Sequence, residues 1–427
     1  MKFSGVFRIN FQMSTVLAIC FMATLVSPLI GMKLRGLRGT WIFFLLWIFL
    51  FTIENRVSLS LYLSTFRKRN FVILMFVLWF LVVLLNAVLE RGYTGWTHVM
   101  HTMTLGMIIF MQITYAALKQ KAFRTIVFWT IILIGLEAAR SLPTLFYNPG
   151  IARYLMDDPD PNQLYMAILA GVGTYNLYTS NAIIMPFFIA AVLNFRGIKR
   201  IILFLSILFI GLAVLLSTFT GAVSIMVLGI LSLVLLTHMK SLKKILIGIA
   251  SIILIICVFI YLFPLLNDIP QVNRVVSKVF RLYEGVSESG LLRGDETTRA
   301  YLFTISLDTF LNNLLLGIGP CTTVPNPGLY TYVGGHSSWM DQLAEYGILG
   351  FGFFIAFAAA VTRRVTRYMF HHKHNLIFIA AFITIILYFI GGLVNPVLFV
   401  YPIMALFYMV MLGGLDIEKQ SLSCGSK

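Results

Sequence analysis

The chain has 427 residues, of which 59% are hydrophobic and only 11% are charged. Soluble globular proteins carry roughly 25% charged residues and about 45–50% apolar ones, so this composition excludes a soluble enzyme, a disordered chain and a fibrous protein. The net charge is +16, but the basic residues stand in short clusters between apolar runs. A nucleic-acid-binding protein gathers them on a soluble face. We therefore expect a protein of the lipid bilayer with no nucleic-acid partner.

Apolar runs along the chain are long enough to cross a hydrocarbon core of roughly 30 Å. Such runs indicate helices, because a helix satisfies its backbone hydrogen bonds within the segment. The run Leu164–Phe195 is too long for one span, and Gly171 and Pro186 break it into an interfacial segment and a span. The fold class predicted is an all-α polytopic membrane protein with about twelve transmembrane helices. The expected spans are Met13–Ile30, Trp41–Ile53, Phe71–Leu89, Thr97–Leu118, Thr125–Ala139, Leu164–Phe195, Ile201–Thr218, Gly221–Thr237, Ile245–Phe263, Asp341–Val361, Leu376–Val394 and Val397–Leu412.

The orientation follows from the positions of Lys and Arg, which concentrate in cytoplasmic loops. With the N-terminus in the cytoplasm, 21 of the 32 basic residues fall on the cytoplasmic side, with only three of the 16 acidic ones. The cluster Lys33, Arg35 and Arg38 is discordant, since this topology places it outside. We predict that both termini are cytoplasmic.

This topology divides the chain into three parts. Residues 1–263 form the first nine spans, with an outer loop at 141–163. Residues 264–340 form one large extracytoplasmic loop with short helical patches such as Thr297–Asn313, and residues 341–427 form the last three spans and a cytoplasmic tail. Long loops are commonly functional, so we expect the chemistry in the large loop.

Two blocks of residues in and after the large loop carry a recognisable pattern. The first begins at Arg293-Gly294-Asp295 and ends in Leu315-Leu316-Gly317-Ile318-Gly319-Pro320. The second begins at His336 and continues through Glu345-Tyr346-Gly347-Ile348-Leu349-Gly350 into the tenth span. This pair resembles the signature of the O-antigen ligase and O-antigen polymerase family.

The resemblance implies a metal-independent, inverting glycosyltransferase of the bacterial cytoplasmic (inner) membrane that needs no cofactor. Its partners would be an undecaprenyl-diphosphate-linked glycan donor, an acceptor glycan, the bilayer and a chain-length regulator or flippase. The acceptor would be another lipid-linked repeat unit in a polymerase of O-antigen or capsule, or lipid A core in a ligase, on the periplasmic or outer face.

Guanidinium groups suit the leaving group of this reaction. They chelate phosphate bidentately and stabilise the charge that grows on a diphosphate as the glycosidic bond breaks. Arg299 and Arg293 are the first candidates for the diphosphate, followed by Arg153 and Arg140. Arg299 has a structural alternative as an ion pair with Glu296, and Arg293 as a solvated loop charge.

His336 is the candidate general base. An imidazole with a pKa near ~6.5 is suited to accept the proton of the attacking hydroxyl, and His98 and His101 are the fallback. The alternative for His336 is a structural role in packing or helix capping. Glu345 would support the site, either by positioning His336 or by capping the first turn of the tenth span, where a carboxylate suits the helix dipole.

Two acidic features remain as alternatives. The run Asp157, Asp158 and Asp160 would suit a divalent metal, although acid-rich turns with Pro more often form turns, and we predict no metal site. Glu137 lies near Arg140 at the outer end of a span, where an ionisable group is a candidate functional residue. A structural ion pair along one helix face explains the two residues equally well.

The choice between polymerase and ligase stays open. Ligase-type members of the family carry a Ser-Arg pair after the seventh span, whereas Thr218–Ser224 holds no arginine, and Arg153 is then the substitute. This absence favours a polymerase. A lipid-linked oligosaccharide flippase is the rival of another class, but a flippase needs polar groups at mid-membrane depth. A structural partner in an export complex is the third alternative.

Overall fold

The computed structural model describes residues 12–27, 29–30, 37–58, 60, 62, 64, 67, 70–89, 95–117, 122–148, 150–155, 160–173, 175–238, 295–320, 333–335, 337–371, 375–394 and 406–407. Within these residues the regular structure is helical and no β-strand is present. Seven of the described helices are long and apolar enough to cross a membrane. These helices are α5 (Asn70–Val88), α7 (Ala122–Tyr147), α10 (Tyr175–Leu193), α11 (Ile198–Leu216), α12 (Thr220–His238), α16 (Ser338–His371) and α17 (Leu376–Val394).

The remaining described helices are α1 (Met13–Val26), α3 (Leu37–Glu54), α6 (Gly95–Ala117), α8 (Ile151–Tyr154), α9 (Pro161–Leu169) and α15 (Asp295–Asn312). The multi-pass helical class is confirmed, and each described span coincides with an apolar run of the sequence. The expected span Ile245–Phe263 lies outside the described residues, as does Val397–Leu412 except for Leu406 and Phe407.

The long run Leu164–Phe195 is divided as the sequence indicates. Helix α9 ends at Leu169, the chain turns at Gly171 with a positive φ of 80°, and α10 begins at Tyr175. Helix α7, in contrast, continues to Tyr147 although its apolar run ends at Ala139. The first residues of the expected outer loop 141–163 are therefore helical, and the candidate membrane span Thr125–Tyr147 includes them.

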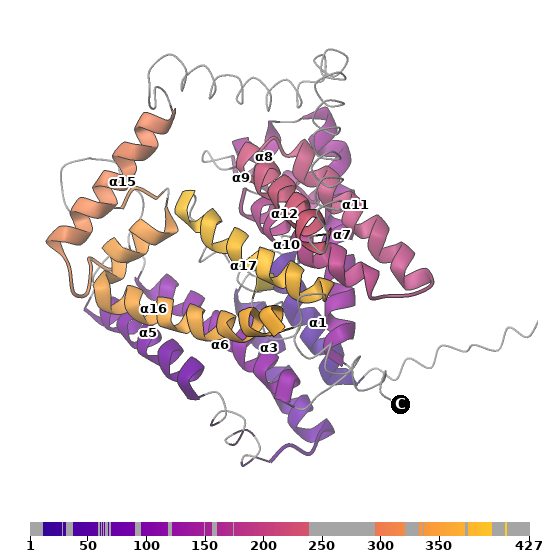
Figure 1. The fold of residues 1–427 in the computed structure, drawn as a ribbon, viewed down its shortest axis with the longest axis horizontal. Coiled ribbons are helices and arrows are strands. Elements are labelled where there is room, and N and C mark those ends of the chain that lie inside the picture. Colours follow the sequence, from indigo (N-terminus) through magenta and orange to yellow (C-terminus); the bar gives the residue numbers. More distant parts are fainter. Residues whose placement is uncertain are drawn as a thin grey trace, which may run out of the picture.

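Helix α10 is the centre of the bundle (Figure 1) and packs against α11, α12 and α17. About four fifths of its spanning window, 78%, is buried, against 28% for α5, α11 and α12. A helix that touches little lipid tolerates polar side chains when its neighbours surround them. Thr179, Ser180 and Asn181 accordingly lie buried in the first two turns of α10.

Polar contacts between helices mark the two opposite faces of the bundle. At one face, which we call the Glu54 face, Ser14 at the start of α1 donates to Glu54 at the end of α3 (2.5 Å between oxygens), and Tyr115 near the end of α6 reaches the Ser14 carbonyl. At the other, the Glu137 face, Ser27 at the end of α1 donates to Glu137 of α7.

The Glu137 face continues to the second motif block. Thr24 of α1 bonds to Thr40 of α3, and the adjacent Trp41 donates to Thr104 in the first half of α6. His98, at the start of α6, then contacts Tyr346 of α16. The Glu54 face and the Glu137 face are therefore the two ends of one bundle.

Candidate functional site

The second motif block lies across a break in helix α16. Gly347 has φ 61° and ψ −170°, which no α-helix accommodates, so the element consists of a short segment from Ser338 and a long one that follows the break. A broken helix leaves free carbonyl groups before the break and free amide groups after it. The residues before the break, Ala344 and Glu345, are buried, so their carbonyl groups need partners within the protein.

The first motif block supplies those partners. The amides of Ile318 and Gly319 donate to the carbonyls of Ala344 and Glu345 at 3.0 and 2.8 Å. In the opposite direction, the amides of Ile348 and Leu349 donate to the carbonyls of Leu314 and Leu315 at 2.8 and 3.3 Å. The two blocks thus form one unit through main-chain hydrogen bonds, here called the interlock (residues 314–319 with 344–349).

Glycine is required at two positions of the interlock. Gly317 has φ 68° and Gly347 has φ 61°, values in the left-handed region that glycine adopts without a Cβ penalty. A Cβ on Gly317 would meet the main chain of Glu345, and one on Gly347 would meet the main chain of Leu315. The glycines of the motif therefore allow two backbones to approach each other.

The interlock is anchored to the helices α5 and α6. The side-chain amide of Asn86 in α5 donates to the Leu316 carbonyl at 3.3 Å. The phenol of Tyr346, which is 2% exposed, lies 2.7 Å from Nδ1 of His98 in α6. The His98 ring stacks on His101, with centroids 5.8 Å apart. His98 and His101, the fallback bases, are thus neighbours of the second block.

His336 and Arg293 lie outside the described residues, so the structure leaves their assignments as predictions. Ser337, the residue after His336, and the nearby Trp339 are held by the last turns of α17. The Ser337 hydroxyl donates to the Gly392 carbonyl at 3.4 Å, and the indole of Trp339 donates to the Phe389 carbonyl at 2.9 Å. The start of α16 is therefore fixed to the spanning helix α17.

Glu345 lies at the end of the short segment of α16 and is 5% exposed. Its Oε2 accepts a hydrogen bond from the Gln342 side chain at 2.9 Å. The acidic residue in the first turn of α16 is Asp341, so Glu345 does not cap that turn. The sequence pattern assigned no role to Asp341, Tyr346 or Asn86. Tyr346 stands between the motif residues Glu345 and Gly347.

The candidate arginines are distributed over different parts of the bundle. Arg299 belongs to α15, which packs against α16, whereas Arg153 belongs to α8 and Arg140 to α7. In Figure 1, α15 lies to one side of α17, with α8 and α9 on the other side. The structure brings the α15 backbone to the interlock but leaves Arg140 and α8 in a separate region.

Arg140 is engaged in a local ion pair. Its Nη2 lies 2.6 Å from Glu137 Oε2 and donates to the Ile168 carbonyl at 3.1 Å. The ion pair of Glu137 and Arg140 along one helix face, one of the two alternatives that the sequence left open, is present. The pair closes α7 against the turn at Gly171, where a Cβ would meet both Arg140 and the Glu137 carbonyl.

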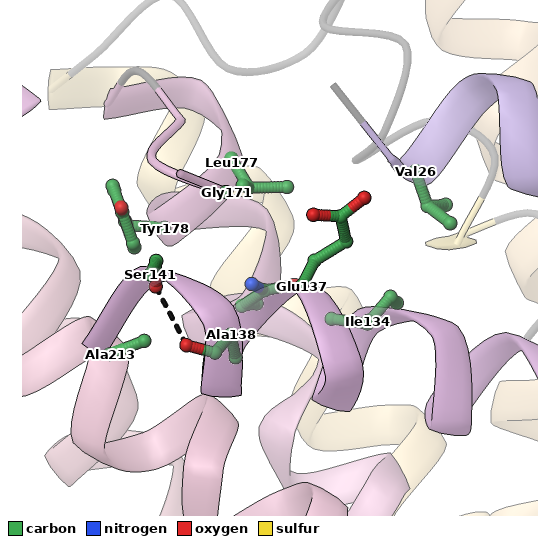
Figure 2. Close-up of a pocket in the computed structure, with 10 residues that line it drawn as sticks. Val26, Ile134, Glu137, Ala138, Ser141, Gly171, Leu177, Tyr178 and Ala213 are labelled. Carbon is green, nitrogen blue, oxygen red and sulfur yellow. Dashed lines mark hydrogen bonds between the residues drawn. The ribbon is translucent and has the colours of Figure 1, made fainter. Parts of the chain in front are cut away.

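Glu137 also lines a pocket between α1, α7, α10 and α11 (Figure 2). Its carboxylate points into the space between Val26 and Leu177, and Tyr178 lies on the opposite side of the pocket. Within the described lining, Asn181 Oδ1 is buried without a hydrogen-bond partner. The pocket lies at the Glu137 face, separate from the interlock, and combines a few polar groups with a mostly apolar lining.

The acidic run is described only at its end. Asp157 and Asp158 lie outside the described residues, and Asp160 accepts the Asn162 amide at 3.2 Å as the N-cap of α9. Among the described residues, no group of three or more His, Cys, Asp or Glu side chains is arranged to hold a metal ion. Asp160 therefore acts as a helix cap, as expected for acids beside Pro in a turn.

Residues 201–355 match the family model described as O-antigen ligase, and this range contains both blocks of the interlock. A search of curated proteins gave no match. The match confirms the resemblance of the chain to the O-antigen ligase and polymerase family.

Proposed function

We propose that the protein transfers a glycan from a lipid-diphosphate carrier to an acceptor hydroxyl at the outer face of the bacterial inner membrane. The observation that carries this proposal is the interlock, in which the amide of Gly319 bonds to the carbonyl of Glu345. The interlock makes the two family blocks a single structural unit at one face of a membrane-spanning bundle.

The distribution of charge supports an outer position for that face. Arg196 stands between α10 and α11, Lys199 and Arg200 stand in the first turn of α11, and Arg363 and Arg367 stand in the last turns of α16. These are the helix ends opposite to the Glu137 face. Since Lys and Arg concentrate on the cytoplasmic side, the Glu137 face and the interlock would be extracytoplasmic, with both termini in the cytoplasm.

The proposed reaction is an inverting displacement. The acceptor hydroxyl oxygen attacks the anomeric carbon of the donor sugar from the side opposite to the diphosphate, and a new C–O bond forms. The old C–O bond breaks, and its electron pair goes to the diphosphate. His336 would take the hydroxyl proton, and Arg299, Arg293 and Arg153 would stabilise the leaving diphosphate.

A polymerase and a ligase differ only in the acceptor. The missing arginine between Thr218 and Ser224 favours a polymerase that joins lipid-linked repeat units. The family match supports a ligase to lipid A core equally, because the matching model is described as O-antigen ligase. Both activities use the same donor chemistry.

The test is a reconstitution with purified components. The protein in lipid vesicles receives an undecaprenyl-diphosphate-linked repeat unit alone, and in a second reaction it also receives lipid A core. We expect a ladder of polymer without the core. Product that forms only with the core would assign a ligase, and no product in either reaction would refute glycan transfer from these substrates.

A further inference from the structure

We infer that Asp341 is a positioning residue, which fixes helix α15 against the segment 333–335 and the start of α16. The inference concerns a side chain for which the sequence pattern assigned no role. Its functional meaning rests on the proposed glycan transfer, since it concerns the elements that carry the candidate base and the candidate diphosphate ligand.

One carboxylate oxygen joins three parts of the chain. Oδ1 of Asp341 accepts a hydrogen bond from the Ser306 hydroxyl of α15 at 2.7 Å and one from the Gly335 amide at 3.2 Å. The Ser306 oxygen in turn accepts the Gly334 amide at 2.8 Å. Ser306 therefore both donates and accepts, and the three residues form a closed network with Asp341.

The side chains of the network are buried. Ser306 is fully buried and Asp341 is 7% exposed. A carboxylate at such a site is costly unless hydrogen bonds satisfy it, and here two donors and the first turn of α16 do so. These partners satisfy the carboxylate oxygen and hold the Asp341 side chain in one place.

Gly334 allows the close approach that the network needs. A Cβ at this position would meet the main-chain carbonyl of Leu302 in α15. Without a side chain, the segment can lie directly against the helix, where its amide reaches Ser306. The contact between α15 and the segment is thus specified by Gly334, Ser306 and Asp341 together.

The network stands at the junction of the two candidate catalytic elements. Arg299 precedes Ser306 by seven residues in α15, so both belong to the helix that the network holds. On the other side, Gly335 is the chain neighbour of His336. A loosened network would let these two elements move relative to each other.

Three variants separate positioning from folding. Ser306→Ala and Asp341→Ala remove hydrogen bonds to a charged group, whereas Asp341→Asn keeps an oxygen that accepts both. We expect kcat per folded protein to fall about tenfold in the two alanine variants and less in Asp341→Asn. The KM for the lipid-linked donor should change less than kcat, because the donor sites themselves are intact.

The controls are matched by environment. Ser206→Ala removes another buried serine, one that donates to the carbonyl four residues earlier in α11. Asp308→Asn removes an exposed carboxylate of α15 itself. Both controls should keep the kcat of the wild-type protein.

The deciding measurement is amide hydrogen exchange of the peptide that contains Gly334 and Gly335, made on the same full-length preparations. We expect Ser306→Ala and Asp341→Ala to accelerate exchange there by about tenfold or more, and Ser206→Ala to leave it unchanged. Unchanged exchange, or faster exchange with an unaltered kcat, would overturn the positioning role. A wild-type protein that transfers no glycan would refute the proposed function, and the positioning role would fall with it, even with accelerated exchange.

Discussion

The amide of Gly319 donates a hydrogen bond to the carbonyl of Glu345 at 2.8 Å. The two residues are distant in the sequence and belong to two blocks whose conspicuous features are glycines and charged side chains. Their contact is made by main-chain atoms. It explains why glycines flank both sides of the junction, since side chains at Gly317 and Gly347 would separate the two backbones.

The first prediction concerns the break in α16. Gly347→Ala should lower the free energy of unfolding by about 2–4 kcal/mol, because a Cβ in the left-handed region is strained and would also meet the Leu315 main chain. Gly352→Ala is the matched control, since its Cβ would meet no atom within 4 Å. The measurement is the thermal unfolding midpoint in detergent. Equal midpoints for the two variants would contradict the interlock.

The second prediction concerns the contact between Tyr346 and His98. The hydrogen bond of 2.7 Å should contribute about 0.5–1.5 kcal/mol, and it holds α6 to the residue between Glu345 and Gly347. A double-mutant cycle with Tyr346→Phe and His98→Phe isolates this term. A coupling energy of zero in unfolding measurements would show that the two side chains do not stabilise each other.

The third prediction separates two roles of Arg140. Arg140→Gln alone leaves the Glu137 carboxylate buried and without its ion-pair partner, so it should destabilise the protein by about 1–3 kcal/mol, less than a fully buried pair because Arg140 is partly exposed. The double variant Glu137→Gln/Arg140→Gln removes both charges and should recover most of this loss.

The same double variant tests the diphosphate assignment of Arg140. Because its guanidinium is already paired with Glu137 and the Ile168 carbonyl, we expect the folded double variant to transfer glycan at nearly the wild-type rate. Complete loss of glycan transfer, at an unchanged unfolding midpoint, would instead support Arg140 as a ligand of the diphosphate.

The fourth prediction concerns metal ions. If arginine side chains neutralise the leaving diphosphate, glycan transfer should continue in an excess of chelator. The measurement is the rate of ladder formation with and without the chelator, and readdition of Mg²⁺ or Mn²⁺ is the control. If the chelator abolished ladder formation and either ion restored it, the result would support a metal site at Asp157 and Asp158 instead.

The helices could largely be predicted from the sequence, because a lipid-spanning helix must be apolar over its whole length. The division of Leu164–Phe195 at Gly171 followed from the same reasoning. The extension of α7 beyond Ala139 was not predicted, because Arg140 and Ser141 interrupt the apolar run and a Pro such as Pro143 commonly ends a helix. The helix nevertheless continues, and its candidate membrane span reaches Tyr147.

The site was predictable only in part. The two blocks and their glycines were recognisable from residue types, and so was the pairing of Glu137 with Arg140 at helical spacing. The hydrogen bonds that join Gly319 to Glu345 were not, because main-chain groups are the same in every residue and carry no sequence signal. Asp341 was likewise unremarkable until the fold brought Ser306 and Gly335 to its carboxylate.

The central claim is that the second block holds the base for glycan transfer, and the most direct measurement is transfer by purified His336→Ala with a lipid-linked repeat unit as donor and acceptor. The wild-type protein should form a ladder, and the variant should form none while keeping the wild-type unfolding midpoint. A wild-type ladder from the folded variant would contradict the assignment of His336.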